Sequence, residues 1–160
     1  MTPAATLLIG YGNPGRGDDG LGPAFARRIA ARGLVGLTVQ IDYQLTVDHA
    51  LLISGAGMVV FADAAMDAAP PFYFRPLSEA DPQTLGSHSV TPEAALSLSR
   101  LLFGAAPTGF VLGLSGAAFG EMAEGLSGPA SHNLDLAEAF FLRWYAAGCA
   151  ADQTAAPGRP

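Results

Sequence analysis

The amino-acid sequence predicts an α/β fold, a three-layer sandwich in which a twisted, mostly parallel sheet of about five strands is flanked by helices. Three observations lead to this prediction. Short apolar runs alternate along the chain with segments of helical period. A glycine-rich loop follows the first apolar run and precedes the first helical segment. The chain has 160 residues, of which 50% are hydrophobic, and this is enough for one buried core.

The expected strands are the apolar or alternating runs at 6–10, 37–41, 58–62, 72–76 and 109–114. The run at 58–62 has no polar residue on either face, which is typical of a central strand that is covered on both sides. Pro76 cannot donate a hydrogen bond to a neighbouring strand. We therefore expect the strand that it ends to lie at an edge of the sheet.

The segments with helical patterns are 22–32, 47–54, 91–103 and a last one that ends near Tyr145. Thr91, Pro92 and Glu93 combine a capping side chain, a first-turn proline and an acid at the positive end of the helix dipole. Ser131 or Asn133 is expected to cap the last helix. Between the fourth strand and the helix at 91 we expect a polar loop.

Composition limits the possible classes of function. Asp and Glu number 14 against 8 basic residues, so the net charge is −6, whereas nucleic-acid binders usually carry the opposite balance. Cys149 is the only cysteine, which excludes an internal disulfide and a cysteine-rich zinc site. We expect a cytoplasmic protein with one domain over 1–148 and a flexible tail over 149–160.

No segment of the sequence predicts export or a membrane partner. The N-terminal residues lack the positive region of a secretory signal. The longest uncharged stretch, 101–120, contains five glycines and Pro107, so we interpret it as a helix end, a loop and a buried strand.

The glycine loop resembles two phosphate- or RNA-related motifs only in part. Residues 10–15 match G-x-G-x-x-G, but Pro14 removes an amide, and Asp18 and Asp19 would face the phosphates of a dinucleotide. The same residues resemble the opening of peptidyl-tRNA hydrolase, an esterase whose loop leads to a catalytic histidine. Here Asp18, Asp19 and Gly20 occupy that place, and the basic groove that tRNA requires is not predicted.

Carboxylates and one imidazole are the remaining candidates for chemistry. Asp18, Asp19 and Asp63 follow predicted strands, and His88 lies in the later polar loop. Two carboxylates and an imidazole suit a divalent transition metal such as nickel, zinc or iron. Each residue also has a structural interpretation, because strand-end aspartates cap helices and loop histidines are commonly at the surface. We assign His49 to a structural role.

Residues 10–22 resemble the opening signature of the nickel-iron hydrogenase maturation proteases, in which G-x-G-N leads into two acids and then G-x-G. Further blocks at 42–49, 61–64, 87–92 and 116–127 resemble the family in the same order, so the resemblance covers about 5–145. The blocks at 42–49 and 116–127 favour the branch that serves NAD-linked bidirectional hydrogenases. The resemblance implies a phosphorylase/hydrolase-like arrangement of the α/β sandwich.

The resemblance also implies site residues. Asp19, Asp63 and His88 would contact nickel that the substrate carries, although other divalent metals could occupy the site. Asp19 and Asp63 would be the catalytic carboxylates of an aspartyl-type peptidase. The residues expected to bind the substrate are Gly10, Gly12, Asn13, Gly15, Asp18 and Asp42. Relatives often have an acid at the position of Ala117, so a role for a side chain there is not carried over.

The resemblance implies an endopeptidase that removes the C-terminal extension of a hydrogenase large-subunit precursor after nickel insertion. Either nickel polarises the scissile carbonyl or a water, or Asp19 or Asp63 acts as a general base. The absence of His-Glu-x-x-His argues against a resident catalytic zinc of that kind. The enzyme is expected to be a monomer. The alternative is a non-catalytic, nickel-dependent chaperone or binding module.

Overall fold

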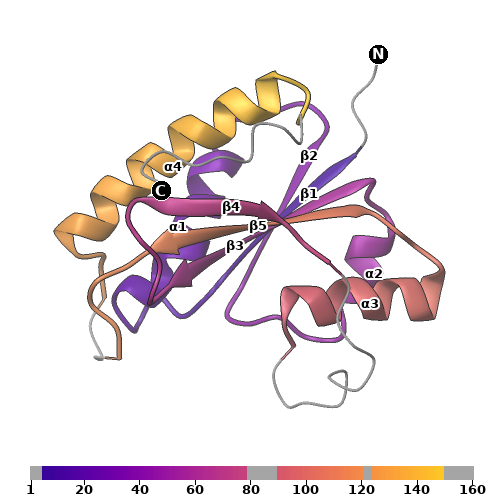
Figure 1. Cartoon of the computed structure of the whole chain (residues 1–160), viewed down its shortest axis with the longest axis horizontal. Coiled ribbons are helices and arrows are strands. Elements are labelled where there is room, and N and C mark those ends of the chain that lie inside the picture. The colour runs from indigo at the N-terminus through magenta and orange to yellow at the C-terminus, as the bar shows by residue number, and fades with distance from the viewer. Residues whose placement is uncertain (1–4, 79–89, 121–123, 150–160) are drawn as a thin grey trace.

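The computed structural model describes residues 5–78, 90–120 and 124–149, and these residues form an α/β sandwich around one mixed sheet (Figure 1). The strands are β1 (Thr6–Tyr11), β2 (Leu37–Asp42), β3 (Met58–Ala65), β4 (Phe72–Pro76) and β5 (Thr108–Ser115). The helices are α1 (Leu21–Ala30), α2 (His49–Ser54), α3 (Pro92–Phe103) and α4 (Gly128–Ala146), with a short 3-10 helix, η1, over Asp18–Gly20.

The sheet has the strand order β2-β1-β3-β5-β4. The first four strands in this order are parallel, and β4 runs antiparallel to β5. The prediction of an edge strand at 72–76 is therefore confirmed. Because β1, β2, β3 and β5 are parallel, they finish at the same end of the sheet, which we call the carboxyl rim. Ligands of such sheets bind outside the carboxyl ends of the strands.

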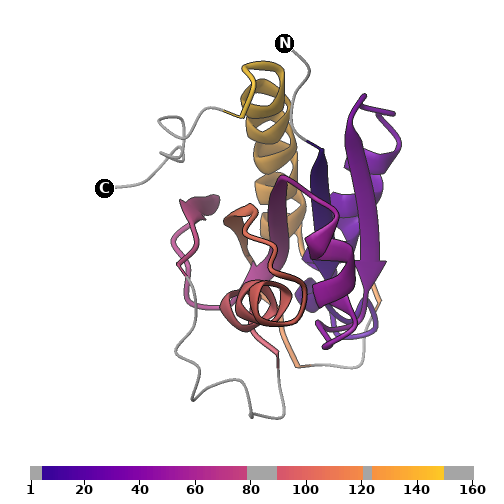
Figure 2. The ribbon, with the colours of Figure 1, turned by 90° about the vertical axis from the view of Figure 1, so that its right-hand side faces the viewer.

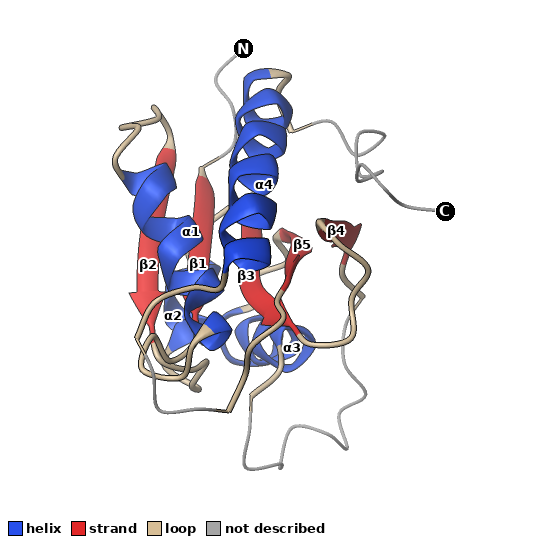
Figure 3. Cartoon of the chain, turned by 90° about the vertical axis from the view of Figure 1, so that its left-hand side faces the viewer, coloured by secondary structure: helices blue, strands red, loops and turns tan. Residues whose placement is uncertain are grey.

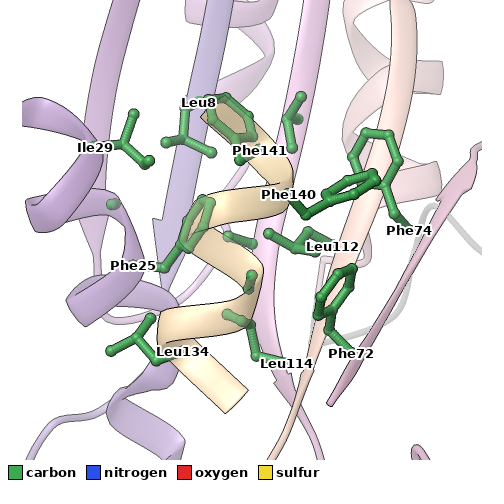
Figure 4. Packing of buried hydrophobic residues seen from close by; sticks show 14 of the residues in the cluster. Leu8, Phe25, Ile29, Phe72, Phe74, Leu112, Leu114, Leu134, Phe140 and Phe141 are labelled. Atoms are coloured by element: carbon green, nitrogen blue, oxygen red, sulfur yellow. The ribbon is translucent and has the colours of Figure 1, made fainter. Parts of the chain in front are cut away.

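Helices cover both faces of the sheet (Figures 2 and 3). On one face, α1 and α4 contribute to a largely aromatic cluster that includes Phe25, Phe74, Phe140 and Phe141 (Figure 4). On the other face, α2 and α3 cover a smaller cluster around Ile9, Val59 and Phe61. The predicted three-layer arrangement is confirmed. No helix among the described residues is both long and apolar enough to cross a membrane.

The start of the last helix differs from the prediction. Ser127 caps α4, and its hydroxyl accepts a hydrogen bond from the Ala130 amide at 3.2 Å. The expected cap Asn133 instead lies inside the helix, is buried, and donates through its side-chain amide to the Ser115 carbonyl at 2.9 Å. Ser127 and Pro129 supply the capping and first-turn signals one turn earlier than we expected.

Other boundaries also differ, and one helix cap is confirmed. The strand predicted at 58–62 continues to Ala65 as β3, because Ala64 and Ala65 still pair with β5. The helix predicted at 47–54 begins at His49 as α2. The Thr91 cap is confirmed, since its hydroxyl accepts from the Ala94 amide at 3.1 Å.

Candidate functional site at the carboxyl rim

Asp63 lies near the end of β3, on the sheet face that α2 and α3 cover. Side chains alternate along a strand, and Val59 and Phe61 of the smaller cluster therefore point to the same face as Asp63. Burial raises the pKa of Asp63 to about 6, and the negative charge of Asp19 adds to this effect. Hydrogen bonds from the Tyr11 hydroxyl and the Ala64 amide act in the opposite direction. Asp63 is thus a carboxyl group that titrates near neutral pH.

Asp19 belongs to η1 and closes the glycine loop. Its Oδ2 accepts a hydrogen bond from the Asn13 amide at 2.8 Å. The Asn13 side chain in turn accepts from the Gly15 amide at 2.9 Å, which holds the turn between them. Asp19 and Asp63 come from segments that are distant in the sequence, and they lie close enough for their charges to interact. The structure therefore brings together the two carboxylates that the sequence singles out.

Asp18 faces away from this pair, into the protein. It is fully buried, and its Oδ2 accepts from the amides of Ala117 and Ala118, each at 2.8 Å. Ser127 donates to the same carboxylate through both its amide and its hydroxyl. Burial alone would raise the pKa of Asp18, but these hydrogen bonds outweigh it and lower the pKa. The described contacts give Asp18 a structural role in joining two loops.

Gly10, near the end of β1, and Gly12, in the loop that follows, are required by close approaches of the chain to itself. A Cβ at Gly10 would overlap the Gly22 carbonyl and the Ala26 side chain. Gly12 has φ +145°, and a Cβ there would overlap the Asp19 carbonyl. Both glycines therefore allow the chain to approach itself closely. Their expected part in binding a peptide stays a prediction.

Asp42, at the end of β2, links this strand to the buried His49 of α2. Its Oδ2 lies 2.8 Å from His49 Nε2 and accepts from the Gln40 side chain at 2.8 Å. The Thr46 amide donates to His49 Nδ1 at 2.9 Å, which leaves the proton on Nε2 to be donated to Asp42. His49 is 4% exposed, in agreement with the structural role that we expected for it.

Two adjoining cavities lie beside the glycine loop and share Asp42 and Tyr43. The first has a volume of about 220 Å³, and its walls include Gly12, Pro14 and Arg27. The second, of about 350 Å³, extends along the β2–α2 connection toward His49. Gly12 and Asp42, both expected to bind the substrate, thus line the same hollow.

His88, the third predicted metal ligand, lies outside the described residues. Val90, two positions later, packs against the cluster that Tyr11 and Tyr73 also contact. Within 5–78, 90–120 and 124–149, no group of three His, Cys, Asp or Glu side chains is arranged to hold a metal ion. The three-ligand site therefore stays a prediction.

Sequence reasoning did not find the partners of these acids. Tyr11 looked like a loop residue after the first apolar run, yet it ends β1 and donates to Asp63. Ser127 was part of a family block and had no assigned role. Leu7 and Ile9 point to one face of β1. Continuing this alternation by one step would have placed Tyr11 on the same face, which is also the face of Asp63.

Comparison with known proteins identifies the fold. No model of a known protein family matches the chain, and no curated protein matches its sequence. Among solved structures, the NiFe hydrogenase maturation protease HycI from Thermococcus kodakarensis has a TM-score of 0.68 at 16% identity and covers 88% of this chain and 92% of its own. The hydrogenase maturating endopeptidase HybD from Escherichia coli also has a TM-score of 0.68 at 16% identity, with coverage of 89% and 93%.

A third similar structure is an uncharacterized protein from Wolinella succinogenes, with a TM-score of 0.64 at 24% identity and coverage of 90% and 98%. At identities this low, the TM-scores and coverages establish a likeness of fold. The expectation from the sequence motifs is confirmed at that level: the chain has the fold of the hydrogenase maturation proteases.

Proposed function

We propose that the protein is an endopeptidase that removes the C-terminal extension of a nickel-iron hydrogenase large-subunit precursor. The observation that carries the proposal is the pairing of Asp19 with Asp63 at the carboxyl rim, in a fold shared with such proteases. The family blocks in the sequence support the same conclusion. The proposed partner is the precursor, and the enzyme acts on it as a cytoplasmic monomer.

In this proposal, nickel belongs to the substrate. Asp19, Asp63 and His88 contact the inserted ion, so that only a nickel-loaded precursor is positioned for cleavage. Carboxylate and imidazole are suitable ligands for nickel. The two described carboxylates are already close together, and their mutual repulsion would decrease when a cation binds between them.

The environment of Asp63 in the metal-free protein supports it as the general base of the hydrolytic step. A general base works best when its pKa is near the working pH, and the pKa of Asp63 is about 6. Asp63 takes a proton from water as the water oxygen attacks the scissile carbonyl carbon. The carbon–nitrogen bond then breaks, and the proton is delivered to the leaving amine. Polarisation of the carbonyl by nickel would lower the barrier of the same step.

The hollow beside Gly12 and Asp42 is the proposed place for the peptide next to the scissile bond. Asn13 and Gly15 shape the loop that borders it, and Asp19 keeps that loop closed. Asp18 supports the loop from the inside through Ser127. An extended peptide would bind there mainly through its main chain.

The test is an incubation of the purified protein with a nickel-loaded precursor and, separately, with a nickel-free precursor. Mass spectrometry should detect loss of the C-terminal peptide only from the loaded form. Cleavage of both forms would show that recognition of the precursor does not require nickel. Binding without cleavage would favour the nickel-dependent chaperone instead.

Three single substitutions test whether each predicted site residue is needed for cleavage. Asp19→Ala, Asp63→Ala and His88→Ala should each abolish cleavage and leave the circular dichroism spectrum unchanged. Cys149→Ala is the control, because Cys149 follows the C-terminal end of α4 and has no proposed part in the site, so the change should be silent. Full activity in any one of the three variants would remove that residue from the site.

A further inference from the structure

A row of residues in register crosses the sheet near the carboxyl rim. Register places Tyr11 of β1 opposite Asp42 of β2. Gly10 pairs with Ala62, so the next residues, Tyr11 and Asp63, follow side by side. Asp63 is opposite Gly113 of β5, which is opposite Tyr73 of β4. Residues in register on neighbouring strands point to the same face, so Tyr11 lies between two aspartates.

The hydroxyl of Tyr11 has one proton to donate, and the two aspartates do not compete for it equally. Oδ2 of Asp42 already accepts from Gln40 and His49, each at 2.8 Å. Asp63 receives the Tyr11 hydrogen bond. Burial and the neighbouring charge of Asp63 raise the pKa of Tyr11, so the hydroxyl keeps its proton at neutral pH.

The other side of Asp63 is occupied by Tyr73. A Cβ at Gly113 would overlap the ring atoms of Tyr73, so the ring lies directly over this glycine. Tyr11 and Tyr73 both pack against the smaller cluster beneath α2 and α3. The Arg75 guanidinium lies 5.6 Å from the centre of the Tyr73 ring. Asp63 is therefore held between a tyrosine that donates to it and a tyrosine seated over the adjacent strand.

We propose that Tyr11 is a positioning residue that orients the Asp63 carboxylate by donating a hydrogen bond to it. The inference rests on the proposed function, since it assigns Tyr11 a part in the same cleavage. Tyr11 does not touch the scissile bond. Its effect passes through Asp63 alone.

The first experiment measures cleavage of a nickel-loaded precursor by Tyr11→Phe. The ring and its packing are kept and only the hydroxyl is lost. We expect kcat to fall roughly ten- to a hundredfold, the range for one hydrogen bond to a charged group, with KM changed by less than about twofold. Tyr11→Met, which also lacks the donor, should show the same loss. An unchanged kcat, or a rise in KM alone, would overturn the inference.

Tyr145→Phe is the matched control. Its hydroxyl donates to the Val35 carbonyl at 2.6 Å, before the start of β2 and so at the opposite end of the sheet. Removal of that hydroxyl should leave kcat unchanged. A fall in kcat equal to that of Tyr11→Phe would mean that loss of any tyrosine hydroxyl disturbs the enzyme, and it would overturn the positioning role.

A second experiment needs no substrate and so separates failure of this inference from failure of the proposed function. Urea unfolding of the metal-free wild type, Tyr11→Phe, Asp63→Asn and the double variant forms a double-mutant cycle. We expect the two substitutions to be non-additive. Additive effects would overturn the contact between the side chains even if the wild type cleaves the precursor.

Discussion

Asp18 binds Ser127 through both carboxylate oxygens, although 109 positions separate the two residues in the sequence. Oδ1 accepts from the Ser127 amide at 2.7 Å, and Oδ2 accepts from its hydroxyl at 2.6 Å. The same serine caps α4. One buried side chain thus connects the glycine loop, the loop after β5 and the start of the last helix.

Asp18→Asn should destabilise the fold by about 3 kcal/mol, because the side-chain amide would present its own donors to groups that already donate. Urea unfolding at pH 7 measures the loss. The lowered pKa of Asp18 means that its stabilising effect is full above pH 4 and disappears as pH falls through the lowered pKa. The difference from wild type should therefore shrink below pH 4. Asp48→Asn, at an exposed aspartate that makes no side-chain cap, should change stability by less than about 0.5 kcal/mol.

Asp63→Asn should stabilise the metal-free protein at pH 7 while it abolishes cleavage. The folded-state pKa of about 6 exceeds the ordinary value of 3.8, so the stabilising contribution of Asp63 is full below pH 4 and is lost as pH rises through 6. Asparagine does not ionise, and at pH 7 the variant should gain about 1–3 kcal/mol. Thermal unfolding in a chelator from pH 4 to 8 measures this. The exposed Asp67, changed to Asn, is the control, and a variant at position 63 that is less stable at pH 7 would contradict the expectation.

Gly113→Ala should displace the Tyr73 ring, because the added methyl group would occupy the space of its atoms. We expect a loss of about 1–3 kcal/mol in the free energy of unfolding, together with slower cleavage. Gly128→Ala is the comparison, since nothing lies within 4 Å of the Cβ that it would add. Equal stability of the two variants would show that the ring can move aside without cost.

His49→Ala should reduce stability by about 2–3 kcal/mol and leave kcat close to that of the wild type. The change removes a buried ring, its hydrogen bond to Asp42 and the acceptor of the Thr46 amide. His132→Ala, at an exposed position of α4, should be silent in both assays. Loss of cleavage by a His49→Ala protein that remains folded would give this histidine a part in the reaction.

The candidate site was predictable where an acidic residue comes directly after an apolar strand or the glycine loop. The run before Asp63 has no polar residue, and this indicated a central strand that carries the acid to its end. The adjacent acids after the glycine loop were equally visible, but their different roles were not. Asp18 turns inward and Asp19 faces the rim, because η1 rotates successive side chains to different sides.

The errors in the helix boundaries have a related origin. Ser127, Ser131 and Asn133 are all good caps, and local preference does not choose among them. Ser127 is selected by Asp18, which is distant in sequence, and Asn133 is taken by the Ser115 carbonyl at the end of β5. Such partners exist only once the strands and α4 have packed.

Local patterns in the chain were therefore sufficient for the class of fold, the order of strands and helices, and the presence of acids at the strand ends, whereas the choice of Asp19 over Asp18 came from the family resemblance. Hydrophobic periodicity and turn-forming residues act over a few positions, so they can be recognised in the amino-acid sequence alone. Strand order, register and helix packing set which residues become neighbours. Tyr11 meets Asp63, and Asp18 meets Ser127, because separate segments are brought into contact by the burial of the shared core.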